Sequence, residues 1–176
     1  MQEIREALER VTAYLSEHPD EATYTDSAAT ATLERGLWVR TTGPAGEHVR
    51  TDMPASVGGI ASAPSAGWLL RAAEASCVAT LVAMRAAQLG YALETLTVTV
   101  DSVSDDRGIL GMDSSIPAGP LRGRISITLS ATGVARADLE EIAHWGVGHC
   151  PVVDAVRRAV PLTVAVDTDT EPGVRS

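Results

Sequence analysis

One segment near the middle of the chain, GWLLRAAEASCVATLVAMRAAQL at residues 67–89, constrains the fold more than any other. Its residues favour a helix, and Gly90 follows where a helix would end. A surface helix carries one apolar stripe, whereas this segment is apolar on nearly every side. We therefore expect a central, buried helix, covered by the other elements or by another copy of itself. Cys77 lies in its middle.

The other segments alternate between helical and strand patterns. Apolar residues recur at helical spacing over residues 2–17, and residues 24–51 are Thr-rich with Gly turns, as in two or three antiparallel strands. A loop is expected over 53–67, strands over 93–105, 123–131 and 162–167, and helices over 136–147 and 150–159, with Ser62, Ser65 and Asp138 as candidate helix caps. This order predicts an α+β fold with an antiparallel sheet, which the last strand closes.

A chain of 176 residues is long enough for one domain with its own core. We expect an N-terminal amphipathic helix over residues 1–20, a single domain over 21–168 and a disordered tail over 169–176.

The charge and hydropathy exclude several partners. A net charge of −9 argues against nucleic acids and anionic membranes, which attract basic surfaces. The most apolar segment contains Arg71, Glu74 and Arg85, so we expect no membrane span. The charged N-terminus lacks the apolar core of a signal peptide, which favours a cytoplasmic location.

The two cysteines are the best candidates for chemistry, because a reducing compartment disfavours a permanent disulfide. Cys150 precedes Pro151, a residue suited to the first position of a helix, so Cys150 occupies the N-cap position. Unpaired amides and the helix dipole favour a thiolate there. The alternative is a small buried side chain that only packs.

The sequence lacks the standard motifs for nucleotide binding, for a serine nucleophile and for a zinc site. The sequence has no P-loop, no G-x-G-x-x-G after a strand and no G-x-S-x-G, so we expect no nucleotide cofactor. His144, His149 and Cys150 match no standard zinc spacing, and we expect no metal, although a site using His149 and Cys150 stays open as a third interpretation.

Three segments in register resemble the OsmC/Ohr family, the osmotically inducible and organic hydroperoxide resistance proteins. They are ATATLER at 29–35, SAGWLLRAAEASC at 65–77 and CPVVDAVRR at 150–158. The resemblance extends from about Tyr24 to Asp167. It implies an intertwined homodimer in which curved antiparallel sheets wrap two long central helices, with the active site at the subunit interface.

The resemblance also implies a thiol-dependent peroxidase. Cys77 would attack an organic hydroperoxide, Cys150 would close a disulfide, and a dithiol such as lipoamide or another thiol would reduce it. Arg35 would hold Cys77 as a thiolate and orient the peroxide. Physical chemistry agrees, because burial alone raises a thiol pKa and a guanidinium is always charged.

One departure from the family pattern favours a second hypothesis. Peroxidase members carry a Pro-Glu pair before the first cysteine, and that glutamate orients the arginine, whereas this chain has Ala66 and Gly67 there. Glu74 or Glu47 could substitute. The alternative is a dimer with inert thiols that binds an apolar ligand or a partner.

Overall fold

The computed structural model describes residues 1–168, and the tail expected over 169–176 lies outside them. The helices and strands, with two 3₁₀ turns at Pro19–Ala22 and Ala55–Val57, are α1 (Gln2–Glu17), β1 (Thr30–Arg35), β2 (Trp38–Thr42), β3 (His48–Thr51), α2 (Ala66–Gln88), β4 (Thr95–Val103), α3 (Asp106–Ile109), β5 (Arg122–Ser130), α4 (Arg136–Gly148) and α5 (Pro151–Arg158). The mixed helix and strand class is confirmed, and both sheets are antiparallel.

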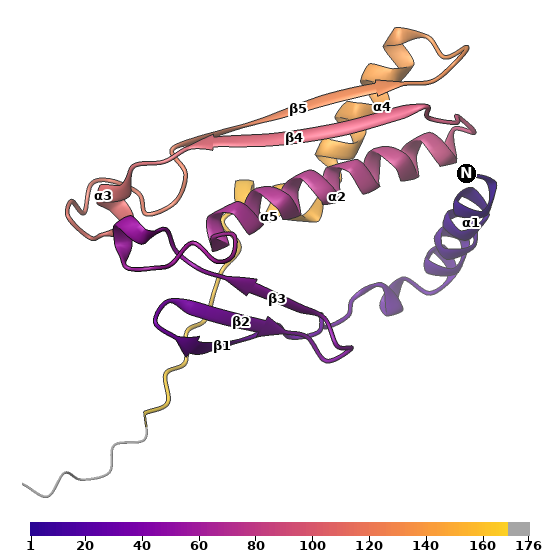
Figure 1. Cartoon of the computed structure of the whole chain (residues 1–176). Coiled ribbons are helices and arrows are strands. Elements are labelled where there is room, and N and C mark those ends of the chain that lie inside the picture. The colour runs from indigo at the N-terminus through magenta and orange to yellow at the C-terminus, as the bar shows by residue number, and fades with distance from the viewer. Residues whose placement is uncertain (169–176) are drawn as a thin grey trace, which may run out of the picture.

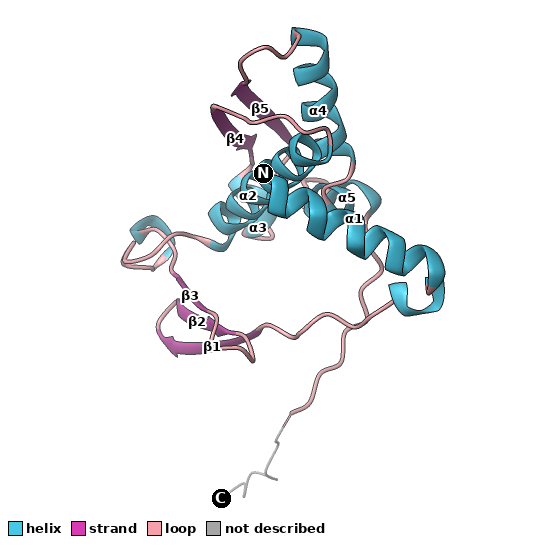
Figure 2. Cartoon of the chain, turned by 90° about the vertical axis from the view of Figure 1, so that its right-hand side faces the viewer, coloured by secondary structure: helices cyan, strands magenta, loops and turns pink. Residues whose placement is uncertain are grey.

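The strands form two separate sheets on opposite sides of α2 (Figure 1). Strands β1, β2 and β3 make one, and β4 and β5 make a long hairpin with pairs from Thr95–Ser130 to Val103–Arg122. Figure 2 shows the β1–β3 sheet standing apart from the packed helices. The Arg35 end of this sheet is therefore not part of the core of its own chain.

The core lies where α2, the β4–β5 hairpin, α4 and α5 meet. Its buried residues come from the three helices and the residue before α5: Val78, Val82, Ala86, Ile142, Cys150 and Val153. The hairpin alternates partly buried apolar residues with exposed polar ones, as a sheet covered on one face requires. Within α2 itself, Val78, Val82, Ala86 and Ala87 are buried. The burial expected for the central helix over residues 67–89 is therefore found on only one side of α2.

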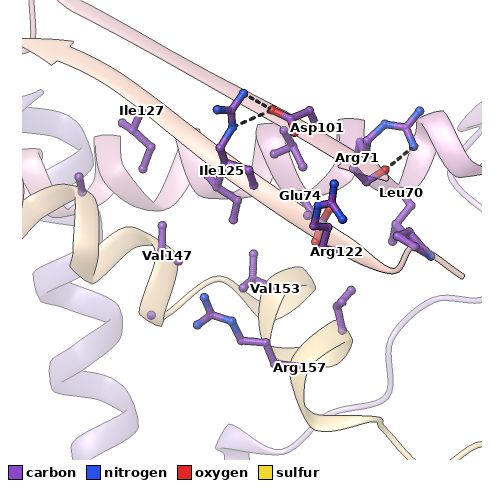
Figure 3. Close-up of a pocket in the computed structure, with 18 of the residues that line it drawn as sticks. Leu70, Arg71, Glu74, Asp101, Arg122, Ile125, Ile127, Val147, Val153 and Arg157 are labelled. Carbon is purple, nitrogen blue, oxygen red and sulfur yellow. Dashed lines mark hydrogen bonds and ion pairs between the residues drawn. The ribbon is translucent and has the colours of Figure 1, made fainter. Parts of the chain in front are cut away.

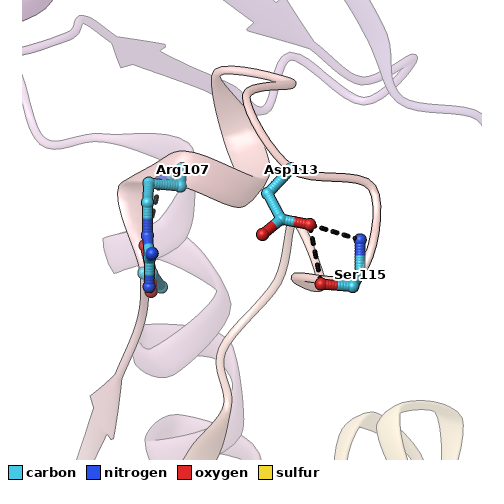
Figure 4. A network of polar contacts seen from close by, with 4 residues as sticks. Arg107, Asp113 and Ser115 are labelled. Carbon is cyan, nitrogen blue, oxygen red and sulfur yellow. Dashed lines mark hydrogen bonds and ion pairs between the residues drawn. The ribbon is translucent and has the colours of Figure 1, made fainter.

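Short polar networks shape the loop that joins β4 to β5. The Asp105 carboxylate accepts hydrogen bonds from the Arg107 backbone N–H at 3.0 Å and from its guanidinium, and Asp113 accepts from the Ser115 N–H and hydroxyl (Figure 4). The hydrogen-bonded Arg107 guanidinium lowers the pKa of Asp105 to about 2. Asp105 is therefore ionised at neutral pH and caps α3.

Two of the predicted caps are wrong. Helix α4 begins at Arg136 after Ala135, so Asp138 lies in its first turn, where its charge suits the dipole but caps nothing. Ser65 does cap α2, since its Oγ accepts from the Trp68 N–H at 3.2 Å. Ser62 instead bonds the Asp52 carboxylate.

The strand expected over residues 162–167 is also wrong for this chain. The segment has no regular structure, and Leu162, Val164 and Val166 are 88%, 82% and 80% exposed. Its alternating pattern suits a strand, but β-structure requires a hydrogen-bonding neighbour, and the described part of this chain supplies none there. The prediction failed because pairing is not a local property.

Helix α1 packs against α2, and no residue of α1 is buried. Within the described part of the chain, α2 alone has the length and the apolar composition that crossing a membrane requires. Core helices of soluble proteins also meet these two criteria. The criteria therefore decide nothing about a membrane.

The contact between α2 and α4 depends on Gly146. A Cβ at that position would lie 2.5 Å from Val82 Cγ2 and 2.9 Å from the Val82 backbone nitrogen. We expect Gly146→Ala to lower the free energy of unfolding by about 1–3 kcal/mol, measured by urea denaturation, because the helices must move apart.

Gly148→Ala is the matched control, since nothing lies within 4 Å of its Cβ position in the same helix. Alanine there should leave stability unchanged or raise it by up to about 1 kcal/mol. Equal effects of the two substitutions would contradict the close packing at Gly146.

Candidate functional site

Cys150 occupies the N-cap of α5, as predicted. Its Sγ accepts a hydrogen bond from the Val153 backbone N–H at 3.5 Å, and Pro151 fills the first helical position. The residue is 0% exposed and belongs to the core cluster. A fully buried thiol can react with a neighbouring sulfur but not with a bulky reagent from solvent.

Cys77 lies halfway along α2, is half-buried, and packs against the cluster that contains Cys150. Burial raises the pKa of the Cys77 thiol, and the neighbouring Cys150 thiol raises it further. The backbone N–H of Val152 acts in the opposite direction and lowers that pKa. The structure therefore brings both sulfurs to the first turn of α5, where two successive amides face them.

Arg35 lies at the end of β1 and is exposed. The strand has an irregularity between Leu33 and Arg35, after which Arg35 pairs with Trp38 of β2. Its guanidinium lies 5.8 Å from the centroid of the Trp38 ring, within the range of a cation–π contact. Arg35 is not among the groups that alter the pKa of Cys77. Within one chain, the structure does not bring Arg35 to the cysteines.

A small cavity of about 150 Å³ lies beside Arg35, and Asp52 also lines it. Asp52 is 3% exposed and is the one buried charged residue of the described chain. Its Oδ2 accepts from the Ile60 N–H, the Ser62 N–H and the Ser62 hydroxyl at 3.2, 3.0 and 2.9 Å. Its Oδ1 accepts from the Met53 N–H at 2.8 Å.

These hydrogen bonds, led by the one from the Ser62 backbone N–H, lower the pKa of Asp52, although burial opposes them. The pKa of Asp52 is lower in the folded protein than in the unfolded chain. The hydrogen bonds therefore stabilise the fold at pH values above the ordinary aspartate pKa, and this stabilisation is lost as the pH falls through the lowered pKa of the folded protein. Asp52 is therefore an anion at neutral pH.

Sequence analysis missed Asp52, although a signal was available. The Gly58-Gly59 pair follows it in the same loop, and a Cβ at Gly59 would lie 1.8 Å from the Met53 carbonyl oxygen. A glycine that allows such close backbone approach indicates a loop folded tightly around something. Here the loop folds around the Asp52 carboxylate.

Glu47 and Glu74, the two glutamates considered as orienting groups, lie elsewhere. Glu47 Oε2 accepts from the Ala45 N–H at 2.9 Å in the turn between β2 and β3. Glu74 lines a different and larger cavity. Neither shares the cavity beside Arg35.

The larger cavity, about 910 Å³, lies beneath the β4–β5 hairpin (Figure 3). Ile125 and Ile127 of β5 face Val147 of α4 and Val153 of α5 across it, so this part of its wall is apolar. Several arginines surround it, including Arg71, Arg122 and Arg157. Cys77, Cys150 and Arg35 are not among its lining residues.

The histidines near Cys150 make other contacts. His149 stacks on Trp145 with ring centroids 4.0 Å apart, and its Nδ1 lies 2.8 Å from the Trp145 carbonyl oxygen. His144 lines the larger cavity. Within residues 1–168 no three His, Cys, Asp or Glu side chains are grouped as metal ligands would be.

Comparisons with known proteins agree with the sequence resemblance. A family model described as OsmC-like protein matches residues 59–165. A comparison with curated proteins gave no match.

Several solved structures share the fold. One is an organic hydroperoxide resistance protein OsmC from Legionella pneumophila, with a TM-score of 0.56 and 18% identity over 77% of this chain and 91% of that one. Another is an OsmC-like protein from Mycoplasma pneumoniae, with a TM-score of 0.64 and 12% identity over 77% and 89%. A third, from Vibrio cholerae, is an OsmC-like protein of unknown function, with a TM-score of 0.62 and 14% identity over 75% and 94%. Such identities establish the fold alone.

The contact between the thiols predicts how each reacts. Iodoacetamide should label half-buried Cys77 before fully buried Cys150, as followed by peptide mass spectrometry. Because the Cys150 thiol raises the pKa of Cys77, Cys150→Ala should move the midpoint of the Cys77 labelling-rate profile to lower pH. Equal labelling of both cysteines, or a midpoint moved upward, would contradict the arrangement.

Proposed function

Because the chain belongs to the OsmC-like protein family, we propose that it is a thiol-dependent peroxidase that reduces organic hydroperoxides. The observation that carries the proposal is the pair of thiols at the first turn of α5, one half-exposed and one fully buried. An attacking thiol must meet a bulky substrate, and a resolving thiol needs to meet only the first sulfur. This assigns attack to Cys77 and resolution to Cys150.

The reaction balances with these two sulfurs. The Cys77 thiolate attacks the terminal oxygen of ROOH, the O–O bond breaks, and an alcohol leaves as the sulfur becomes a sulfenic acid. The Cys150 sulfur then attacks Cys77, a disulfide forms and water leaves. A dithiol such as lipoamide, or another thiol, reduces the disulfide in the cytoplasm. No further cofactor is needed for this cycle.

The protein would act as a homodimer. It exposes 12954 Å², whereas a compact monomer of 18.4 kDa exposes about 8,200 Å². The uncovered side of α2 and the exposed segment over residues 162–167 are surfaces that a second copy would cover.

Dimerisation would also complete the active site. Burial raises the pKa of Cys77, so the thiolate needs a cation, and no guanidinium within residues 1–168 of its own chain acts on it. The β1–β3 sheet that carries Arg35 stands away from its own core (Figure 2). We assign Arg35 of the partner subunit to Cys77, where it would stabilise the thiolate and orient the peroxide.

The alternative function is a dimer with inert thiols that binds an apolar ligand. The large cavity favours it, because Ile125, Ile127 and Val147 are among its lining residues and neither cysteine is. The two functions differ in whether peroxide changes the thiols, which a mass measurement decides.

Treatment with one equivalent of cumene hydroperoxide should remove two daltons from the parent protein as a Cys77–Cys150 disulfide forms. Cys150→Ser should instead hold a sulfenic acid on Cys77 that dimedone traps, and Cys77→Ser should not react. Intact mass with free-thiol counting is the readout. Two unreacted thiols in the parent protein would exclude the peroxidase and leave the ligand-binding alternative.

A mixed dimer tests whether Arg35 acts across the interface. Cys77→Ser should be inactive alone and Arg35→Met should keep only a slow but measurable rate, but a co-expressed, doubly tagged heterodimer should regain about half the activity, because one of its two sites pairs intact Cys77 with intact Arg35. Light scattering supplies the control that the purified species is a dimer. No recovery in that heterodimer would place Arg35 and Cys77 of one site in the same chain.

A further inference from the structure

Arg35, Trp38 and Asp52 lie in a row across one end of the β1–β3 sheet. Arg35 pairs with Trp38, and Val39 pairs with Thr51, so Trp38 and Asp52 occupy the next positions of their segments. Neighbouring strands lie about 4.8 Å apart, which puts the outer two backbones about 10 Å from each other. An arginine side chain can reach over one intervening strand, and Arg35 already lies over the Trp38 ring.

Within residues 1–168, neither the Arg35 guanidinium nor the Asp52 carboxylate forms an ion pair with a side chain of opposite charge. Within residues 1–168, ion pairs involve seven arginines, and Arg35 is not one of them. Asp52 likewise has hydrogen-bond donors but no cation, although a buried carboxylate is normally paired. Both residues line the same cavity of about 150 Å³. Oδ1 accepts one hydrogen bond, which leaves a lone pair for a guanidinium.

We propose that Asp52 is the positioning carboxylate of Arg35. Its negative charge fixes the direction in which the Arg35 guanidinium points from the end of the sheet. The inference rests on the proposed function for what Arg35 then does at the thiolate. Asp52 itself does not touch substrate.

The connections of Asp52 suit this role. Its backbone N–H donates to the Pro64 carbonyl at 3.2 Å, directly before the Ser65 cap of α2. Asp52 therefore ties the Arg35 end of the sheet to the start of the helix that carries Cys77. Glu47 is engaged in a turn and Glu74 faces the other cavity, so Asp52 is the carboxylate that shares a cavity with Arg35.

A purely structural role is the competing explanation, because four hydrogen bonds to one carboxylate would hold the loop by themselves. A double-mutant cycle separates the two. The rate constant for oxidation of Cys77 by cumene hydroperoxide is measured in the parent, Asp52→Asn, Arg35→Met and the double variant. Urea unfolding of the same four proteins supplies a readout that does not need activity.

Asp52→Asn should slow oxidation about tenfold in the parent and have no further effect in Arg35→Met. The unfolding free energies of the four proteins should also be non-additive. Ser62→Ala is the matched control, since it removes one hydrogen bond to the carboxylate but keeps its charge. It should weaken the loop and leave the oxidation rate close to that of the parent.

Equal slowing by Asp52→Asn in both backgrounds, or slowing by Ser62→Ala as large as that by Asp52→Asn, would overturn the inference in favour of a structural role. Additive unfolding free energies would overturn it too, whether or not the protein is active. If the parent fails to oxidise while unfolding remains non-additive, the proposed function fails and the pairing of Asp52 with Arg35 stands.

Discussion

Helix α2 has apolar residues around most of its circumference, and one chain covers only the side that faces the hairpin, α4 and α5. Leaving the other side in water would expose a large apolar surface beside the apolar cavity beneath the hairpin. Two other features of the chain agree with this one-sided coverage of α2. The β1–β3 sheet stands away from the core, and the last described residues extend without a partner, as in a chain whose remaining contacts come from another molecule.

The environment of the two thiols combines opposing effects. Burial of Cys77 favours the neutral thiol, whereas the amides at the start of α5 favour a thiolate. Because the amides do not outweigh burial within one chain, the proposed peroxidase would need a positive charge beside Cys77 that α2, α4 and α5 do not provide. Such a site would remain unreactive in an unassembled chain.

Arg35, the cation that we propose for this thiolate, belongs to a different part of the chain. Arg35 lies at the end of a strand with exposed residues, where its side chain has freedom to move, and Trp38 restricts it from one side. Asp52 lines the same cavity, and hydrogen bonds from backbone amides hold its carboxylate. A charge fixed in this way can direct a flexible guanidinium more precisely than a carboxylate that is itself mobile.

The sequence by itself determined the elements with strong local signals. The central helix, its Ser65 cap, the alternating strands β4 and β5 and the Cys150–Pro151 helix start were all predicted, because periodicity, capping and proline geometry act over a few neighbouring residues. The three segments in register also indicated the family. The strand over residues 162–167 and the Asp138 cap of α4 were predicted wrongly: the first has no pairing neighbour in the described chain, and the second lies inside the first turn of the helix. Only the tertiary structure decided that the two thiols meet at α5, that Arg35 lies away from them within one chain, and that Asp52 and Arg35 line one cavity. Those relations join residues far apart in the sequence, and the packing of a few elements fixes them where no local pattern can.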